Sequence, residues 1–197
     1  MPDPLVRCAW ANGPEDYQRY HDEEWGREVR EDAALFERLC LEGFQAGLSW
    51  LTVLRKREAF REALAGFVPE QLARQGEADV SRHLQNVGLI RHRGKLEAAI
   101  ANARALCAGW ERHGEGWLTA EFEAHAPTDD SLSSQGFRRP PAVLSDLPAS
   151  TAESERLSKA LRQAGFRFVG PTTIYAAMQA TGFVSDHTTD CFRAPKG

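Results

Sequence analysis

The chain of 197 residues has a formal net charge of −4 and is long enough for one well-buried core, or for two small lobes that share one. Its apolar runs fall far short of the ~20 residues of a membrane span, and the N-terminus lacks the basic and then apolar pattern of a signal peptide. We therefore expect a cytoplasmic protein whose four cysteines are thiols or metal ligands rather than a disulfide framework.

Charged residues are unevenly distributed. Acidic residues dominate between Glu15 and Glu37, whereas the stretch 55–57 and the region 82–112 are rich in arginine and lysine. A separate basic face is compatible with nucleic acid at that face, and ordinary solvated helix surfaces explain the same pattern about equally well.

The spacing of apolar residues predicts an all-α protein. Helices are expected over about 15–25, 32–41, 48–64, 69–72, 79–85, 93–107, 151–165 and 170–182. Asp32 and Asp79 are the expected N-caps of their helices, and Gly43 and Gly47 are expected to bracket a bend. Residues 126–147, rich in proline and serine, are predicted to form a long loop.

Two of these helices are joined by a short turn that contains glycine. The turn lies between Asn86 and Lys95 and includes Gly88. Two helices connected in this way indicate a unit of the helix-hairpin-helix kind.

Two cysteines and two histidines lie near the ends of the chain. They are Cys8 and His21 at one end, and His187 and Cys191 at the other. Two thiolates and two imidazoles can complete a closed tetrahedral zinc site, and His-x-x-x-Cys places both side chains on one face if that segment is helical. Spacing alone, however, favours four unrelated residues. The other histidines show no ligand spacing and are expected at the surface: His83, His92, His113 and His125.

The stretch 41–50 contains one carboxylate, Glu42, and one indole, Trp50, in an otherwise apolar run with two glycines. Tyrosine and tryptophan are concentrated nearby in the sequence, at Trp10, Tyr17, Tyr20, Trp25 and Trp50. Each brings a polar group that a plain core does not need. We predict that Glu42 and Trp50 line a pocket for one flat heterocycle; the alternative is a mixture of core and surface aromatics.

Several separated motifs resemble the DNA-3-methyladenine glycosylase I family. In chain order, the matching stretches are 8–10, 20–26, 41–57, 88–95, 157–159, 165–172 and 186–187. They cover nearly the whole chain.

The resemblance implies an all-α, helix-hairpin-helix glycosylase fold with a structural zinc site that joins the N- and C-terminal segments. It implies one unit of two lobes: residues of about 1–30 and 165–197 form the zinc-bearing lobe, and about 31–125 contains the hairpin. The implied zinc ligands are Cys8, His21, His187 and Cys191. The implied base pocket consists of Trp10, Tyr17, Tyr20, Trp25, Glu42 and Trp50.

The implied activity is base-excision repair. The protein is expected to act as a monomer on double-stranded alkylated DNA, to flip out 3-methyladenine and to hydrolyse its N-glycosidic bond without lyase activity. Glu42 is the candidate catalytic and base-recognising group. The candidate DNA-binding residues are Gly47, Leu48, Gly88, Arg91, Arg93 and Lys95.

The sequence between Val80 and Ala126 contains no Asp that could act as a catalytic acid after the hairpin, which fits a substrate whose base is already labile. The alternatives are a non-catalytic module that binds alkylation damage, and a glycosylase that also removes 3-methylguanine weakly.

Overall fold

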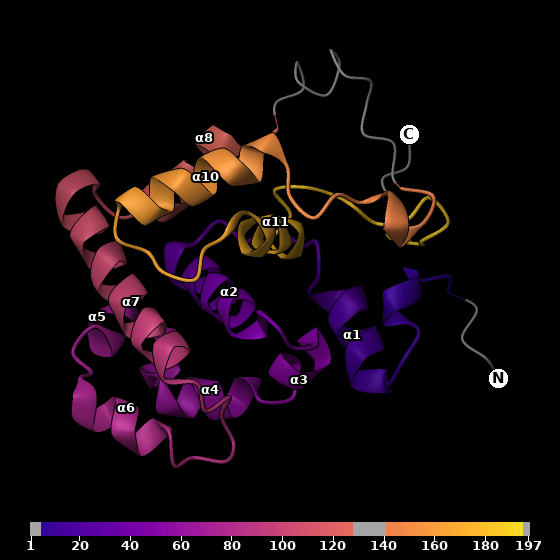
Figure 1. Ribbon diagram of the computed structural model, residues 1–197. Coiled ribbons are helices and arrows are strands. Elements are labelled where there is room, and N and C mark those ends of the chain that lie inside the picture. Colours follow the sequence, from indigo (N-terminus) through magenta and orange to yellow (C-terminus); the bar gives the residue numbers. More distant parts are fainter. Residues whose placement is uncertain (1–4, 128–140, 195–197) are drawn as a thin grey trace.

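The computed structural model describes residues 5–127 and 141–194, and the regular structure within these ranges is entirely helical (Figure 1). The α-helices are α1 (Glu15–Glu23), α2 (Asp32–Gln45), α3 (Trp50–Leu54), α4 (Arg57–Ala63), α5 (Pro69–Leu72), α6 (Glu77–His83), α7 (Arg93–His113), α8 (Trp117–His125), α10 (Ala152–Gln163) and α11 (Pro171–Ala180). Short 3-10 turns are η1 (Ala9–Ala11), η2 (Ala65–Phe67) and η3 (Leu144–Asp146). The predicted all-α class is confirmed. Among the described residues, no helix is long and apolar enough to cross a membrane.

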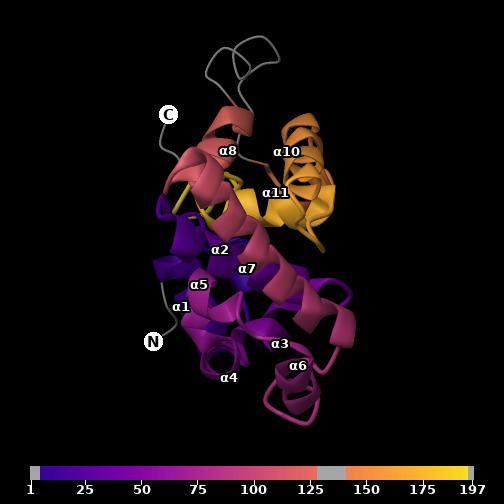
Figure 2. The same ribbon diagram turned by 90° about the vertical axis from the view of Figure 1, so that its left-hand side faces the viewer.

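Helix α2 lies at the centre of the molecule and contacts α3, α7, α8 and α11 (Figures 1 and 2). Its apolar stripe, Leu35, Phe36 and Leu39, is fully buried, as the helical spacing predicts. A polar group on the last turns of this helix is therefore carried into the interior, which is the position of Glu42.

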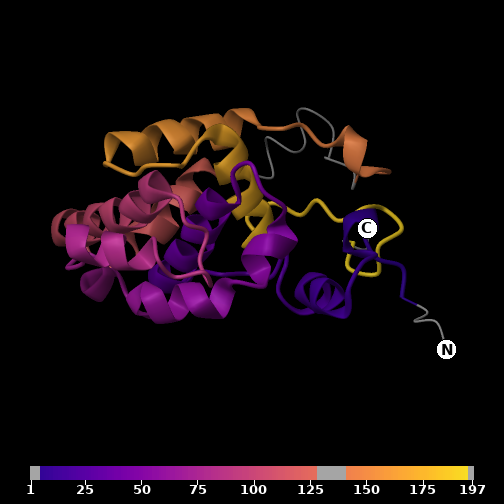
Figure 3. The same cartoon turned by 60° about the horizontal axis from the view of Figure 1, so that its bottom comes forward.

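The two ends of the described chain lie side by side next to α1 (Figure 3). The Phe192 amide donates to the Val6 carbonyl at 2.9 Å, and the Gly26 amide donates to the Ala180 carbonyl at 3.2 Å. These contacts join segments that are far apart in the sequence.

The bend after α2 is shorter than predicted. Helix α2 continues through Gly43 to Gln45. The chain packs closely at Gly43, because a Cβ atom there would lie 3.5 Å from the Phe168 carbonyl oxygen. The turn itself falls at Gly47, whose φ of +80° favours glycine. The helix predicted over 48–64 is broken at Arg55 and Lys56 into α3 and α4.

Asp32 and Asp79 are not N-caps. Asp32 is the first residue of α2, and its carboxylate accepts from Trp110 Nε1 at 2.6 Å and from the Thr119 amide at 2.8 Å. It thus caps the start of α8, a helix that apolar spacing did not predict. Asp79 is the third residue of α6, and its carboxylate accepts from the Gly76 amide at 2.9 Å.

Two further predictions can be compared with the structure. His83 is buried, contrary to its expected surface position, and its Nε2 lies 2.9 Å from Gln75 Oε1. Of the loop predicted over 126–147, residues 128–140 lie outside the described residues, and the rest includes η3.

Candidate active site

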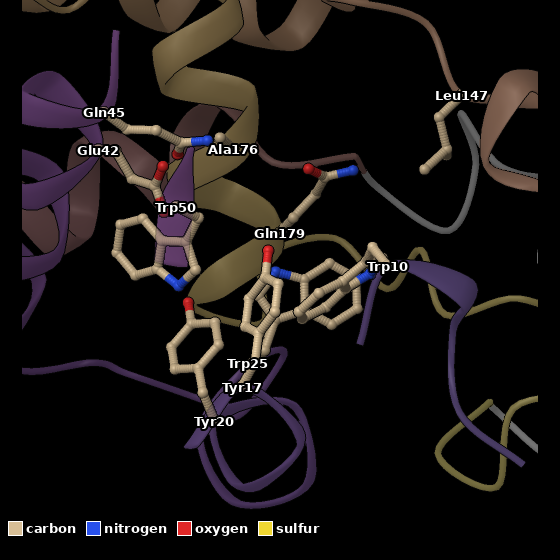
Figure 4. A pocket seen from close by; sticks show the side chains of 10 residues that line it. All are labelled: Trp10, Tyr17, Tyr20, Trp25, Glu42, Gln45, Trp50, Leu147, Ala176 and Gln179. Atoms are coloured by element: carbon tan, nitrogen blue, oxygen red, sulfur yellow. The ribbon is translucent and has the colours of Figure 1, made fainter. Parts of the chain in front are cut away.

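A cavity of about 190 Å³ lies between η1, α1, the end of α2, the start of α3 and α11 (Figure 4). It is lined by Trp10, Tyr17, Tyr20, Trp25, Glu42, Gln45, Trp50, Leu147, Ala176 and Gln179. The structure thus brings together all six residues expected to form a base pocket.

Aromatic rings form two flanks of this cavity. Tyr20 and Trp50 make one flank, with ring centroids 5.2 Å apart. Trp10 contacts Tyr17 and Trp25 on the other flank at centroid distances of 5.0 and 5.1 Å. Trp50 Nε1 is buried without a hydrogen-bond partner among the described residues. The pocket therefore offers flat aromatic walls, which suit a planar heterocycle.

The carboxyl group of Glu42 enters the same cavity, and the residue as a whole is 6% exposed. No hydrogen bond joins it to another residue in the part of the chain that the structure describes. Burial raises the pKa of Glu42 to about 8, although the Arg38 charge opposes the shift. A buried carboxyl without an internal partner is costly, which indicates that its partner is a ligand.

Ion pairs lie near the Tyr20 flank, where the Arg38 guanidinium is 6.0 Å from the centroid of the Tyr20 ring. Glu24 accepts from Arg38 Nη2 and from Arg57 Nη1, each at 2.6 Å. Asp16 accepts from Arg55 Nε at 2.7 Å. The basic stretch 55–57 is therefore partly neutralised by the acidic N-terminal region, so it is not the separate basic face that its charge pattern suggested.

Four lining residues were missed by the sequence analysis as pocket residues: Gln45, Leu147, Ala176 and Gln179. Ala176 and Gln179 are three residues apart on α11, so they share one helix face. The Gln179 amide is oriented by donating to Asp186 Oδ2 at 2.8 Å. Because α11 is far from the aromatic segment in the sequence and has an ordinary composition, its sequence carries no signal for this role.

The predicted hairpin joins α6 to α7 and is held by local polar contacts. Lys56 Nζ donates to the carbonyls of Val87 and Gly88 at 2.9 and 3.1 Å. His92 is the N-cap of α7, since its Nδ1 accepts from the Lys95 amide at 3.3 Å. These contacts fix the turn on the side of α4.

The candidate DNA-binding cations differ in their surroundings. Arg91 is exposed and forms no ion pair with another described residue. Arg93 is exposed and donates to Glu77 Oε1 at 2.7 Å. Lys95 is only 7% exposed, and its Nζ donates to the Phe44 and Ala46 carbonyls at 3.0 and 2.6 Å. The expected contact between Lys95 and a phosphate is therefore corrected, because its ammonium points into the protein.

Gly47 and Leu48 form the exposed tip of the bend between α2 and α3. The Leu48 side chain is 43% exposed, although it is large and apolar. The bend lies directly beside the end of α2, where Glu42 enters the pocket.

The two cysteines and two histidines from the chain ends form a buried cluster whose ligand atoms all lie within 4.8 Å of one another. Cys8 Sγ and Cys191 Sγ are each 3.6 Å from His187 Nδ1, and Cys191 Sγ is 3.4 Å from His21 Nε2. The segment from His187 to Cys191 is not helical, so a turn rather than a helix face brings these two together.

The geometry of this cluster fits a zinc ion. A tetrahedral zinc with bonds of about 2.3 Å to sulfur and about 2.05 Å to nitrogen separates neighbouring sulfur and nitrogen ligands by about 3.6 Å. The other ring nitrogen of His21 lies 2.8 Å from Asp22 Oδ1, and Arg7 Nη2 donates to Asp22 Oδ2 at 2.7 Å. A carboxylate behind a histidine ligand is typical of metal sites.

Comparison with known proteins gives one consistent result. A family model described as methyladenine glycosylase matches residues 10–194. The chain is 44% identical over 189 residues to DNA-3-methyladenine glycosylase 1 of Escherichia coli (strain K12), covering 95% of this chain and 96% of that protein. It is also 44% identical over 188 residues to the DNA-3-methyladenine glycosylase of Haemophilus influenzae, covering 94% and 96%. A crystal structure of 3-methyladenine DNA glycosylase I matches with a TM-score of 0.87 and 45% identity, over 96% of this chain and 100% of that one.

Proposed function

The chain belongs to the methyladenine glycosylase family, and from this premise we propose that it excises 3-methyladenine from alkylated double-stranded DNA. The damaged nucleotide is extruded from the stack and its base enters the aromatic cavity. The C1′–N bond breaks, and the base leaves as a neutral molecule with the bonding electrons. Water supplies the hydroxyl of the resulting abasic sugar, and its other proton is released to solvent. The observation that carries this proposal is the unpartnered Glu42 carboxyl within an aromatic pocket.

The chemistry of the lesion suits a site with few acidic groups. 3-Methyladenine in DNA carries a positive charge, so the base departs as a neutral molecule and needs no strong protonation. Aromatic walls attract such a cationic ring by about 0.5–2 kcal/mol for each good contact. Glu42 is the single carboxyl among the residues that line the cavity. The site therefore favours a labile cationic base over a stable neutral one.

Glu42 gives the pocket its selectivity for adenine. An ionised carboxylate accepts a hydrogen bond from the exocyclic amine of adenine and complements the charge of the methylated ring. Guanine presents a carbonyl oxygen at the equivalent edge, which faces the carboxylate unfavourably. Trp50 is the main stacking wall, and Tyr20 is the donor beside it.

The reaction ends at the abasic site. A lyase step requires a free amine at the sugar carbon, and no lysine lines the described cavity. The ammonium of Lys95 is engaged by two carbonyl oxygens, so it is not available as a nucleophile. These observations support a monofunctional enzyme.

The hairpin and the bend hold the duplex. The side chains of Arg91 and Arg93 bind phosphates without reading the sequence. The amide of Gly88 donates to Asn86 Oδ1 at 2.8 Å, so it must leave this partner before it can bind a phosphate. Leu48, at the tip next to Gly47, fills the space left by the extruded nucleotide. Its large exposed apolar side chain supports this assignment.

We infer one structural zinc per chain, held by Cys8, His21, His187 and Cys191. All four positions are filled by protein ligands, so the ion has no open position for a water or a substrate. The zinc fastens a lobe of residues of about 1–30 and 165–197, next to a hairpin lobe of about 31–125. The protein acts as a monomer.

The test of the function is the release of free base from alkylated duplex DNA, with the products identified. We expect 3-methyladenine to be released and strand breaks to appear only after separate cleavage of abasic sites. A folded, zinc-loaded protein that binds the DNA but releases no base at any enzyme concentration would instead be a damage-binding module. Release of 3-methylguanine at a comparable rate would contradict the assigned selectivity of Glu42.

Arg91→Ala is expected to weaken DNA binding equally on all sequences and to lower the slope of log affinity against log salt by about 1, because one phosphate contact is lost. Arg93→Ala is expected to act in the same direction. Arg93 donates to Glu77 and must leave this partner before it can bind a phosphate. The measurement is duplex binding at several salt concentrations. Arg156→Ala is the control, since its helix α10 lies on the opposite side from the hairpin (Figure 1). An unchanged slope for both hairpin variants would place the DNA on another face.

A further inference from the structure

Lys95, a residue of α7, caps the C-terminal end of α2 with its side chain. It lies in the first turn of α7, and its Nζ donates to the Phe44 carbonyl at 3.0 Å and to the Ala46 carbonyl at 2.6 Å. These carbonyls stand at the C-terminal end of α2, where the last carbonyls of a helix have no partner within that helix. A cation there also complements the helix dipole.

The environment of Lys95 explains why a charged residue is kept in a nearly buried place. Lys95 is 7% exposed, and its ammonium donates to the two carbonyl oxygens, with no carboxylate partner among the described residues. Lysine is almost never buried unless it is paired. An ammonium with three donors can satisfy both orphan carbonyls, which a purely apolar side chain cannot do.

The two segments joined by Lys95 have separate tasks in the proposed function. On one side are the bend tip, with Gly47 and Leu48, and Glu42 in the last turns of α2. On the other side is the start of α7, directly after Arg91 in the hairpin. Within the bend itself, the Leu48 amide donates to the Gln45 carbonyl at 2.7 Å.

We propose that Lys95 is a positioning residue that holds the bend carrying Leu48 against α7, the helix after the hairpin. Phosphate binding by the hairpin and nucleotide extrusion by the bend then occur together. This rests on the proposed function of the site. Lys95 touches neither the base nor a phosphate. Its removal should therefore impair extrusion and excision and leave the electrostatic part of DNA binding intact.

Lys95→Met tests this directly, because methionine keeps an unbranched side chain and removes the charge and the donors. In single-turnover excision at saturating enzyme, we expect the rate to fall roughly 10- to 100-fold, the range expected for misplaced reacting groups. The salt slope for undamaged duplex should stay at the parent value. Arg91→Ala is the matched comparison, with a slope lowered by about 1. A lowered slope for Lys95→Met would overturn the proposal and make Lys95 a phosphate contact.

A measurement without DNA separates local positioning from general loss of stability. Hydrogen exchange of the free protein should accelerate in Lys95→Met over residues 44–49 and remain at the parent rate in the other described helices. Uniform acceleration throughout, with an excision rate that follows the unfolded fraction, would reduce Lys95 to a stabilising residue and overturn the proposal.

A double-mutant cycle with Leu48→Ala identifies what Lys95 positions. If Lys95 acts through the bend, the two substitutions lower the excision rate by less together than the product of their separate effects. Independent, multiplicative effects would contradict that route. If the parent protein itself releases no base, the proposed function fails, whereas the salt-slope and hydrogen-exchange measurements still decide the role of Lys95.

Discussion

Glu42→Gln is expected to slow the release of 3-methyladenine about 100-fold, an effect of the size seen when one preorganised electrostatic group is removed from an active site. Glutamine keeps the shape of the side chain but cannot carry the charge that complements a cationic base. The aromatic walls remain, so the fold and much of the stacking should persist. Single-turnover release of 3-methyladenine measures the loss.

The pH dependence should identify Glu42 as the responsible group. Burial raises its pKa to about 8, so the carboxyl of the base-free protein is mainly protonated at neutral pH and ionises as the pH rises through that value. The ionised form pairs with the cationic base. We therefore expect kcat/KM to rise with pH up to about 8 and then to level off, and this limb to be absent in Glu42→Gln.

The same raised pKa predicts that the stability contribution of Glu42 falls as the pH rises, whereas kcat/KM rises. The folded-state pKa lies above the ordinary value of 4.5, so the contribution of this group to stability is fully present below pH 4.5 and is lost as the pH rises to about 8. Glu42→Gln removes that loss, and near pH 8 it should be more stable than the parent by roughly 2 to 4 kcal/mol. Denaturant unfolding at several pH values measures this difference.

Glu37→Gln is the matched control for both measurements. Glu37 lies on the same helix but pairs with Arg61 Nε at 2.8 Å, away from the cavity. It should keep the parent excision rate and its pH limb. If Glu42→Gln excises as fast as the parent, or is less stable than the parent at pH 8, Glu42 is neither the base-recognising group nor a strained buried carboxyl.

The pocket residues were predictable because their chemistry is unusual for their sequence context. A lone carboxylate in an apolar run and tyrosines and tryptophans in place of phenylalanine each point to a ligand, and the structure brings Glu42, Trp50 and Trp10 around one cavity. Gln179 was missed because an amide on a helix of ordinary composition carries no such signal. Its place depends on the packing of α11 against α2.

Polar groups that serve a distant element were the hardest to interpret. Asp32 stands at the start of α2, as an N-cap would, yet it caps α8 instead. Helix α8 itself was missed because it has only nine residues, and Leu118 and Phe122 are its only pair of large apolar side chains at i, i+4 spacing. Lys95 follows two arginines in a basic turn, so its sequence context suggests a surface cation. Its ammonium points into the protein because it donates to the Phe44 carbonyl at the end of α2. Sequence spacing describes one element at a time, whereas these roles arise between elements.

Loss of the proposed zinc should be the most damaging change to the fold. Cys191→Ser is expected to abolish tight metal binding and to lower the melting temperature by roughly 10 °C or more, corresponding to about 4 kcal/mol. The cluster joins Cys8 to Cys191, so without the ion the two chain ends are tied mainly by a few backbone contacts. Metal analysis of protein purified without added zinc should find about one zinc per parent chain and little in the variant.

The same loss should reach the pocket, because two of the proposed metal ligands also contact its walls. The Trp25 ring lies 4.6 Å from the ring of His187, and the Trp10 ring lies 5.2 Å from that of His21. Cys191→Ser should therefore weaken binding of free 3-methyladenine even at temperatures where the variant is folded. Cys107→Ser, outside the cluster, is the control and should keep both the metal and the base affinity. A parent protein without metal, or a metal-free variant with unchanged stability and base affinity, would show that the cluster neither fastens the chain ends nor supports the pocket.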